Sequence, residues 1–405
     1  MPRFTPQNAA EAAEIIARAA AGNQPLEIIA GASKRALGRP VASNDVLDIS
    51  ALRGIISYEP AELVLSVHAA TPMSEIEAAL SEHQQMLAFE PPDWRGLLGS
   101  GGEPTLGGVV ACNQSGPRRV RAGAARDYFL GFSAINGWGE SWKAGGKVVK
   151  NVTGYDMSKL QAGAFGTLSV LTEITLKVMP KPQTATTILL PSLAGEVAIA
   201  LLSQALNTPY EISGAAHLPA VVARRSGVAA AAQGGAVTAL RLEGHAPSVA
   251  FRVEAAEVLL GRGERLDAAQ SAQFWREVGE VSPLLPAEGR VIWRLCPTPS
   301  AAPEVLQGIS GAFASAEAYY DWGGGLIWLS LDAAAAGPDA GAAAVRGAMA
   351  RAGGHATLIA APAALRTAVP VFTPLPGPLE ALARRVKQSF DLRGILNPGR
   401  IQEGH

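Results

Sequence analysis

The sequence predicts an α+β protein with two main domains and a C-terminal segment. Apolar stretches of strand length alternate with amphipathic stretches of helix length along the 405 residues, which favours sheets covered by helices. No G-x-G-x-x-G opens a helix after the first predicted strand, so the dinucleotide fold that carries this fingerprint is not expected. Composition shifts at Pro180-Lys181-Pro182. We therefore expect domains at 1–181 and 182–370, with 371–405 returning to the first domain.

The elements of the first domain follow from apolar periodicity and turn residues. Asn8 is expected to cap the first helix and Thr71 the second. Asn136-Gly137, a pair typical of hairpin turns, ends one of the strands. The expected ranges are helices 6–21 and 73–82, and strands 26–30, 46–50, 63–69, 128–135 and 172–178.

The second domain alternates Ala-rich helical stretches with short strands, and the chain ends in a specific run of turn residues. Asp332 to Gly341 is expected to be a loose loop. The run Asp391 to Ile401 contains Asn397-Pro398-Gly399 and is expected to dock on the first domain. The other expected ranges are strands 239–243, 291–295 and 326–330, and a helix over 379–390.

Charge and cysteine content exclude several classes of partner. Lys and Arg number 34 against 35 Asp and Glu, and no long basic run exists, so a nucleic-acid partner is not expected. Cys112 and Cys296 lie far apart and neither belongs to a C-x-x-C pair. No zinc or iron–sulfur site is therefore expected, and a reduced, cytoplasmic protein is the natural inference.

No membrane-spanning or targeting segment is expected. The N-terminus lacks the apolar core of a signal peptide. The most apolar long stretch, 188–206, is interrupted by Pro191 and Glu196 and is a poor candidate for a bilayer span.

Two glycine-rich stretches are candidates for a phosphate site. One runs from Gly31 to Gly38 directly after a predicted strand, and the other runs from Pro104 to Gly116. Glycine lets a backbone approach a ligand closely, and consecutive free N–H groups bind anions. A plain glycine-rich loop between strands is the alternative for either stretch alone.

Five motifs in one order resemble a known family. They are the loop at Gly31, the Gly107-Gly108 segment, Lys150 to Asp156, Gly163 to Leu171, and Asn397 to Arg400. Their spacing resembles the FAD-linked oxidases of the vanillyl-alcohol oxidase (PCMH-type) superfamily, and within it the FAD-binding E subunits of bacterial glycolate oxidases. Further parallels are Phe274-Trp275, Trp293-Arg294-Leu295 and Asp321-Trp322-Gly323-Gly324.

The resemblance implies a PCMH-type, two-subdomain FAD-binding fold with a reduced α+β cap domain. It also implies where FAD is held. The phosphates are expected at the backbone of Gly31, Ala32, Ser33, Gly107 and Gly108, with Lys34 either adding charge or solvated at the surface. Neighbouring positions in the same loops are Ala30, Thr105 and Leu106. The sugar–phosphate chain is expected beside Asn113, Ser115 and Gly116, and the adenine beside Gly163, Gly166, Thr167 and Val170.

The FAD is expected to be non-covalent. Many members of the superfamily attach the flavin through histidine, or histidine and cysteine, but Ala30 to Lys34 contains neither. Cys112, in the second motif, is interpreted as a small buried residue.

No catalytic or metal-binding residue is predicted. Related glycolate and D-lactate dehydrogenases carry a His-x-Gly-Asp-Gly-Asn-x-His run that is missing here. His217, His245 and His355 stand apart from one another and are expected to be structural or surface residues. Arg118, Arg119, Arg121 and Arg126 are expected to be solvated, with partner binding as the alternative.

The resemblance therefore implies an auxiliary role. The chain would be the FAD-binding subunit of a complex that oxidises glycolate to glyoxylate, with a catalytic FAD subunit and an iron–sulfur subunit as partners and a small 2-hydroxy acid as substrate. Membrane association would come only through those partners. The alternatives are a self-sufficient 2-hydroxy-acid dehydrogenase in which Arg294 holds the carboxylate, and a scaffold without flavin.

Overall fold

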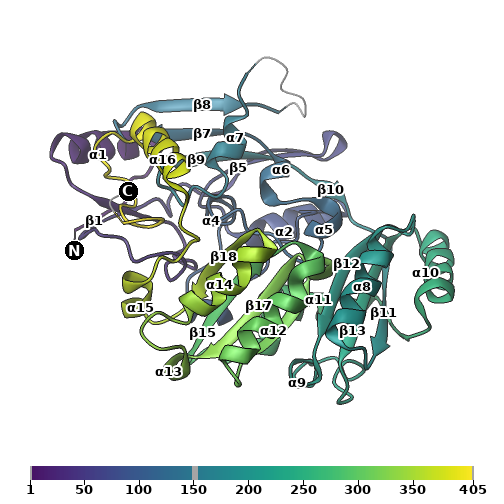
Figure 1. The fold of residues 1–405 in the computed structure, drawn as a ribbon. Coiled ribbons are helices and arrows are strands. Elements are labelled where there is room, and N and C mark those ends of the chain that lie inside the picture. Colours follow the sequence, from purple (N-terminus) through teal and green to yellow (C-terminus); the bar gives the residue numbers. More distant parts are fainter. Residues whose placement is uncertain (1, 148–153, 404–405) are drawn as a thin grey trace.

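The computed structural model describes residues 2–147 and 154–403 and confirms the predicted α+β class (Figure 1). The chain forms two lobes. The first lobe holds the N-terminal elements and the C-terminal helix, and the second lobe is built on one large sheet (Figure 1). Lys150 to Thr153, part of the third predicted motif, lie outside the described residues.

The first lobe contains a small parallel sheet and a five-stranded antiparallel sheet. The parallel sheet has the order β1-β3-β2, and the antiparallel sheet has the order β4-β5-β9-β7-β8. Their strands are β1 (Arg3–Phe4), β2 (Leu26–Ile29), β3 (Asp45–Asp48), β4 (Ile55–Glu59), β5 (Val64–His68), β7 (Phe129–Asn136), β8 (Ser141–Gly145) and β9 (Ser169–Lys177). A separate short pair joins β6 (Gln85–Met86) to β10 (Met179–Pro180).

The helices of the first lobe pack on these sheets, and a common apolar cluster includes Ile16, Leu47, Leu65, Val110 and Ile174. The longer helices are α1 (Ala9–Ala21), α2 (Met73–Glu82), α4 (Leu106–Ala111), α7 (Met157–Gln161) and, from the C-terminus, α16 (Gly377–Phe390). Single turns are α3 (Arg95–Leu98), α5 (Arg119–Ala122), α6 (Ala125–Tyr128) and the 3-10 turn η1 (Pro60–Glu62).

The second lobe is an eight-stranded antiparallel sheet of order β14-β11-β13-β12-β16-β17-β15-β18. Its strands are β11 (Thr184–Pro191), β12 (Ile212–Leu218), β13 (Val237–Gly244), β14 (Glu264–Leu266), β15 (Arg290–Cys296), β16 (Glu317–Asp321), β17 (Leu326–Asp332) and β18 (His355–Ala360). The three strands predicted in this domain are therefore confirmed, within β13, β15 and β17.

Helices cover one face of this large sheet, and the other face packs on the first lobe. The covering helices are α8 (Gly195–Leu206), α10 (Ala246–Leu260), α12 (Ala302–Ala312) and α14 (Ala342–Ala352). On the opposite face an apolar cluster joins Trp275 and Trp328 to Trp94 of the first lobe. The remaining helices are α9 (Ala220–Ala223), α11 (Ala268–Glu280), α13 (Ala333–Ala336) and α15 (Ala363–Ala368), with 3-10 turns η2 (Ser282–Leu284), η3 (Pro299–Ala301) and η4 (Trp322–Gly324).

Several local predictions are confirmed and two are wrong. The Asn8 side chain caps α1 by accepting from the amide of Glu11, and β7 and β8 pair as the predicted hairpin. Thr71 does not cap α2, because its hydroxyl instead bonds the carbonyls of His68 and Gly54. The expected loose loop after Asp332 begins with the short helix α13, which that aspartate caps.

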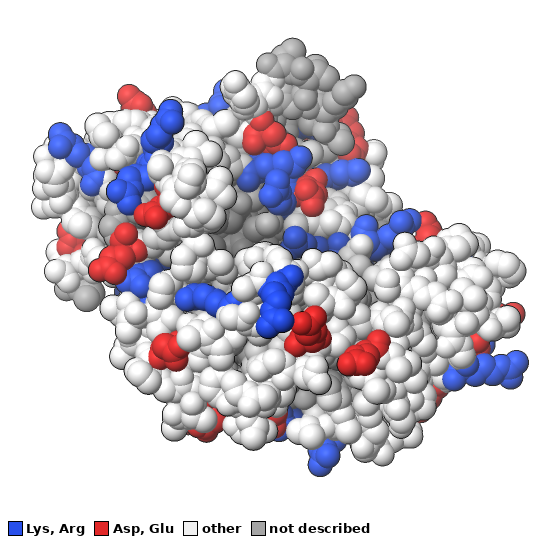
Figure 2. Space-filling model, in the orientation of Figure 1, with Lys and Arg blue, Asp and Glu red and all other residues white. Residues whose placement is uncertain are grey.

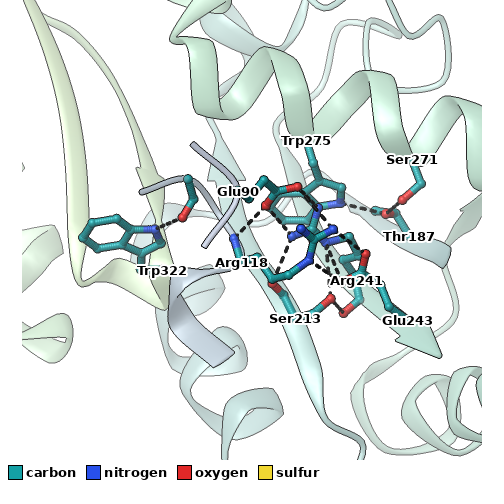
Figure 3. Close-up of polar contacts among 10 residues, drawn as sticks. Glu90, Arg118, Thr187, Ser213, Arg241, Glu243, Ser271, Trp275 and Trp322 are labelled. Atoms are coloured by element: carbon teal, nitrogen blue, oxygen red, sulfur yellow. Dashed lines mark hydrogen bonds and ion pairs between the residues drawn. The ribbon is translucent and has the colours of Figure 1, made fainter. Parts of the chain in front are cut away.

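A buried network of charged side chains ties the two lobes together (Figure 3). Arg241 on β13 donates from both terminal nitrogens to Glu90 of the first lobe, at 2.8 and 2.9 Å. Arg118, also of the first lobe, donates to Glu243 on β13 at 3.0 and 2.8 Å. Arg118 was expected to be solvated, but its side chain is only 14% exposed. The prediction was wrong because its partner lies in the other lobe.

The charges of this network stabilise one another. Burial opposes ionisation of the Glu243 carboxyl, but Arg241 and Arg118 outweigh it and lower its pKa from 4.5 to about 2. The network therefore contributes stability above pH 4.5, and this stability is lost as the pH falls toward 2.

We predict that Arg241→Met lowers the free energy of unfolding by about 3–5 kcal/mol, because it leaves buried carboxylates without their partner. Urea denaturation at pH 7 measures this, and the loss should shrink toward pH 2. Arg225→Met is the matched control, because Arg225 and Glu317 form a partly exposed pair worth about 1 kcal/mol or less. Equal losses of unfolding free energy for the two variants would contradict a special stabilising role of the buried network.

Candidate functional site

A pocket of about 870 Å³ empty volume lies in the first lobe, where four chain segments far apart in the sequence meet. The segments are the end of β2 with the loop after it, helix α4, the loop 161–171 and the C-terminal run. Of the predicted FAD residues, those that line the pocket are Ala30, Gly31, Ala32, Ser33, Lys34, Thr105, Gly107, Gly108, Gly166 and Val170.

The loop after β2 presents free backbone donors to the pocket. The amides of Gly31, Ala32 and Ser33 make no hydrogen bond to any residue in the described ranges. The backbone of Ala32 lies in the left-handed region, with φ of 56°. Consecutive amides around such a residue form a concave donor site for anions.

Gly31 is required by the close approach of a second loop. A Cβ on Gly31 would lie 1.8 Å from the carbonyl oxygen of Glu103, and a Cβ on Gly102 would lie 2.0 Å from that of Gly31. The loops 31–33 and 101–104 are thus in backbone contact, which holds the loop after β2 in place.

The second glycine motif forms a helix, where a loop was expected. Thr105 caps α4 by accepting from the amide of Gly108 at 3.4 Å, and the amide of Gly107 donates to the carbonyl of Ala69 at 2.7 Å. A Cβ on Gly107 would lie 2.7 Å from that same oxygen. Both amides therefore have partners inside the protein, and what these glycines give the pocket is close approach of the backbone.

Two cations border the pocket without an acidic partner. Lys34 lies near the α4 backbone, and a Cβ on Gly108 would be 3.8 Å from its Nζ. Arg400, which is 7% exposed, donates to the carbonyls of Arg35 and Arg39 and to no other described residue. Burial lowers the pKa of both side chains. Neither forms an ion pair within the part of the chain that the structure describes, so an anion in the pocket would be stabilising.

The C-terminal run holds the walls of the pocket together, as Asn397 shows. Its side-chain oxygen accepts from the amide of Ile28 and its nitrogen donates to the carbonyl of Phe165, each at 2.8 Å. Sequence analysis predicted that this run docks on the first domain but did not assign Asn397 or Arg400 to the site. The Asn-Pro-Gly-Arg run was the available signal.

Gln161 and Cys112 also line the pocket and were not predicted there. The side-chain nitrogen of Gln161 is buried and has no hydrogen-bond partner among the described residues, while its oxygen accepts from Ser169. An unpaired buried donor of this kind indicates a missing acceptor. The Cys112 thiol has a raised pKa, because burial outweighs the nearby Lys34 and Arg400.

The other predicted FAD residues do not line this pocket, and each has a structural role. Asn113 and Ser115 accept from the backbone amides of Arg126 and Ala125. Leu106 is a core residue, and Gly116 is in close contact with the Glu90 carbonyl. The hydroxyl of Thr167 donates to the carbonyl of Ala164, and Gly163 takes a φ of 85° in the same loop.

None of the histidines that the structure describes lines the pocket. His217, on β12, bonds Thr238 through its ring nitrogen, and burial lowers its pKa to about 4. It is therefore a buried structural residue, as expected. Within residues 2–147 and 154–403, no three His, Cys, Asp or Glu side chains are placed to hold a metal ion. Nor does any helix in those ranges combine the length and apolarity of a bilayer span.

This chain is similar to known proteins over nearly its whole length. A family model described as an FAD binding domain matches residues 3–145. Glycolate oxidase subunit GlcE of Escherichia coli (strain K12) is 36% identical over 389 residues, which cover 96% of this chain and 95% of GlcE. Glycolate oxidase subunit GlcD of Bacillus subtilis (strain 168) is 39% identical over 101 residues, or 25% of this chain and 21% of GlcD.

Solved structures show the same fold at low identity. A 4-ethylphenol oxidase from Gulosibacter chungangensis superposes with a TM-score of 0.71 at 13% identity, covering 99% of this chain and 89% of the oxidase. An alkyldihydroxyacetonephosphate synthase gives a TM-score of 0.68 at 14% identity, with coverage of 98% and 75%. The predicted PCMH-type architecture and the FAD cofactor are thus confirmed.

We predict that Gly31→Ala lowers both the stability and the FAD content of the protein, because its methyl group must separate two backbones. The expected loss is about 1–3 kcal/mol in the free energy of unfolding, with the flavin-to-protein absorbance ratio well below that of the unmodified protein. Gly101→Ala is the control, since no heavy atom lies within 4 Å of a Cβ there. A Gly31→Ala protein with full flavin content would refute the described loop contact.

Proposed function

We propose that this chain, which belongs to the family of glycolate oxidase subunit GlcE, is the FAD-binding subunit of a complex that oxidises glycolate to glyoxylate. The basis is identity of 36% over nearly the whole length of both chains. Similarity to D-lactate dehydrogenase of Anaerostipes hadrus, 32% over 146 residues, is limited to 36% of this chain and fits a shared FAD-binding domain.

The observation that carries the proposal is a set of hydrogen-bond donors and a cation at the pocket that have no acidic partner among the described residues. The free amides of Gly31, Ala32 and Ser33 and the unpaired Lys34 fit the pyrophosphate of FAD, which needs donors and positive charge. Gln161 offers one further donor. When bound, FAD supplies the acceptor for the hydride and electrons.

The residues present favour a non-covalent flavin. Cys112 is the one nucleophilic sulfur that lines the pocket among the described residues, and burial keeps its thiol protonated. The loop Ala30 to Lys34 holds neither histidine nor cysteine.

An auxiliary role within a complex is the form of this function that we favour. Glycolate oxidation needs a base for the hydroxyl proton, and no histidine within residues 2–147 and 154–403 lines the pocket. With only Cys112 and Cys296, an iron–sulfur cluster cannot be held here. We therefore propose a catalytic FAD subunit and an iron–sulfur subunit as partners. We also propose that the protein is cytoplasmic and reaches a membrane only through those partners.

An anaerobic titration of the purified chain tests this function. The protein should be yellow, acid should release its FAD, and glycolate or D-lactate should leave the flavin oxidised unless the partner subunits are present. Bleaching of the flavin by glycolate with this chain alone would contradict the auxiliary role. A protein that neither contains nor takes up FAD would contradict the function as a whole.

We predict that Lys34→Met weakens FAD binding roughly 10- to 100-fold, because it removes a charge-assisted contact to phosphate. The apoprotein should become more stable, because a partly buried, unpaired cation is lost. Flavin titration and thermal melts of the apoprotein measure the two effects. Lys143→Met, at an exposed position on β8, is the control. Unchanged FAD affinity in Lys34→Met would show that Lys34 does not face the phosphates.

A further inference from the structure

A second pair of unpaired cations lies where the two lobes meet. Arg119 comes from α5 of the first lobe and Arg294 from β15 of the second. Their guanidinium carbons lie 4.5 and 5.1 Å from the centre of the same ring, Trp322. The ring nitrogen of Trp322 donates to the carbonyl of Gly116 at 3.1 Å, which fixes the ring against the first lobe (Figure 3).

These two arginines differ from their neighbours in one respect. Arg118 and Arg241 are paired with Glu90 and Glu243 in the network described above. Arg119 and Arg294 form no hydrogen bond or ion pair through their side chains with residues 2–147 or 154–403, although both are partly buried. Leaving two neighbouring cations unpaired in such a position costs free energy unless an anion joins them.

The surroundings remain positive when the nearby ionisable groups are included. Burial and the proximity of Arg294 lower the pKa of Arg119, and Cys296 and Asp127 offset this only in part. The Cys296 thiol at the end of β15 has a lowered pKa, because Arg294, His355 and Arg119 outweigh its burial.

Asp321 is the acidic group directly before Trp322. It is 1% exposed, and burial raises its pKa to about 7 despite Arg241 and Arg294 nearby, with Glu90 acting in the same direction as burial. Asp321 is therefore about half neutral at pH 7 and largely neutral well below it, so it cancels at most part of the charge of the two arginines.

The pair is connected to the cofactor pocket through a shared apolar cluster. Trp322 and Cys296 pack against the same apolar cluster as Phe165 and Cys112, and these last two residues line the pocket. Figure 2 shows basic side chains along the hollow between the two lobes, while acidic side chains are scattered over the surface.

We propose that Arg119 and Arg294 form a binding site for the carboxylate of a small 2-hydroxy acid, with Trp322 holding both guanidinium groups in place. Planar guanidinium groups match carboxylates in a bidentate manner. The inference rests on the proposed function, because it assigns that function's substrate class to residues of this chain. It concerns binding alone, since an arginine cannot accept the hydroxyl proton.

Calorimetric titration tests the site with oxalate, which the flavin cannot oxidise by hydride transfer, and with glycolate. Arg119→Gln and Arg294→Gln should each weaken oxalate binding at least about tenfold. Arg121→Gln is the matched control, because Arg121 lies on the same helix and pairs with the exposed Glu211. It should bind oxalate like the unmodified protein. Flavin content and thermal melts of each variant show that it is folded.

Three outcomes would overturn the proposal. They are equal oxalate affinity in all variants, competition by sulfate as strong as by glycolate, and loss of partner-subunit binding without any change in oxalate affinity. The last would assign the arginines to an acidic segment of a partner. A protein that contains no FAD would contradict the proposed function, but oxalate binding to the same apoprotein would still test the arginine pair.

Discussion

The cofactor pocket depends on one buried side chain, Asn397. Its amide bonds the backbone of Ile28 at the end of β2 and that of Phe165 in the loop opposite, so one residue near the end of the chain joins two segments that each lie more than 200 residues before it. Lys387 reinforces the joint by donating to the carbonyls of Thr167 and Leu396. The pocket therefore exists only when the C-terminal run has returned to the first lobe, and flavin retention should depend on the folding of the whole chain.

Charge is paired in one part of the protein and left unpaired in another. Where the lobes must be held together, Arg118 and Arg241 face Glu90 and Glu243. Lys34 and Arg400 at the pocket, and Arg119 and Arg294 between the lobes, have no such partners among the described residues. Because partly buried cations are costly alone, we propose that both pairs bind anions, the first a pyrophosphate and the second a carboxylate.

Local features of the fold could be predicted from the sequence, and tertiary ones could not. Apolar periodicity and turn residues located β2, β5, β13 and the β7–β8 hairpin, and glycines located the loop at Gly31. The helical state of 106–111 was missed because its glycines are tolerated only through the Thr105 cap and close contact with Ala69. Asn113 and Ser115, which the sequence predicts as FAD contacts, also accept from the backbone amides of Arg126 and Ala125, and the glycine-rich pattern gave no sign of these bonds. The partner of Arg118, Glu243, lies 125 residues away in the sequence, so no local sequence pattern could predict this ion pair.

Hydrogen exchange with and without FAD tests the central claim most directly, because it locates the cofactor on the backbone. The account predicts that FAD slows exchange in peptides covering 30–35, 105–112, 161–171 and 395–401, with the strongest effect at Gly31 to Ser33, whose amides are otherwise free. Protection confined to the second lobe, or full exchange at Gly31 to Ser33 in the FAD-bound protein, would contradict it.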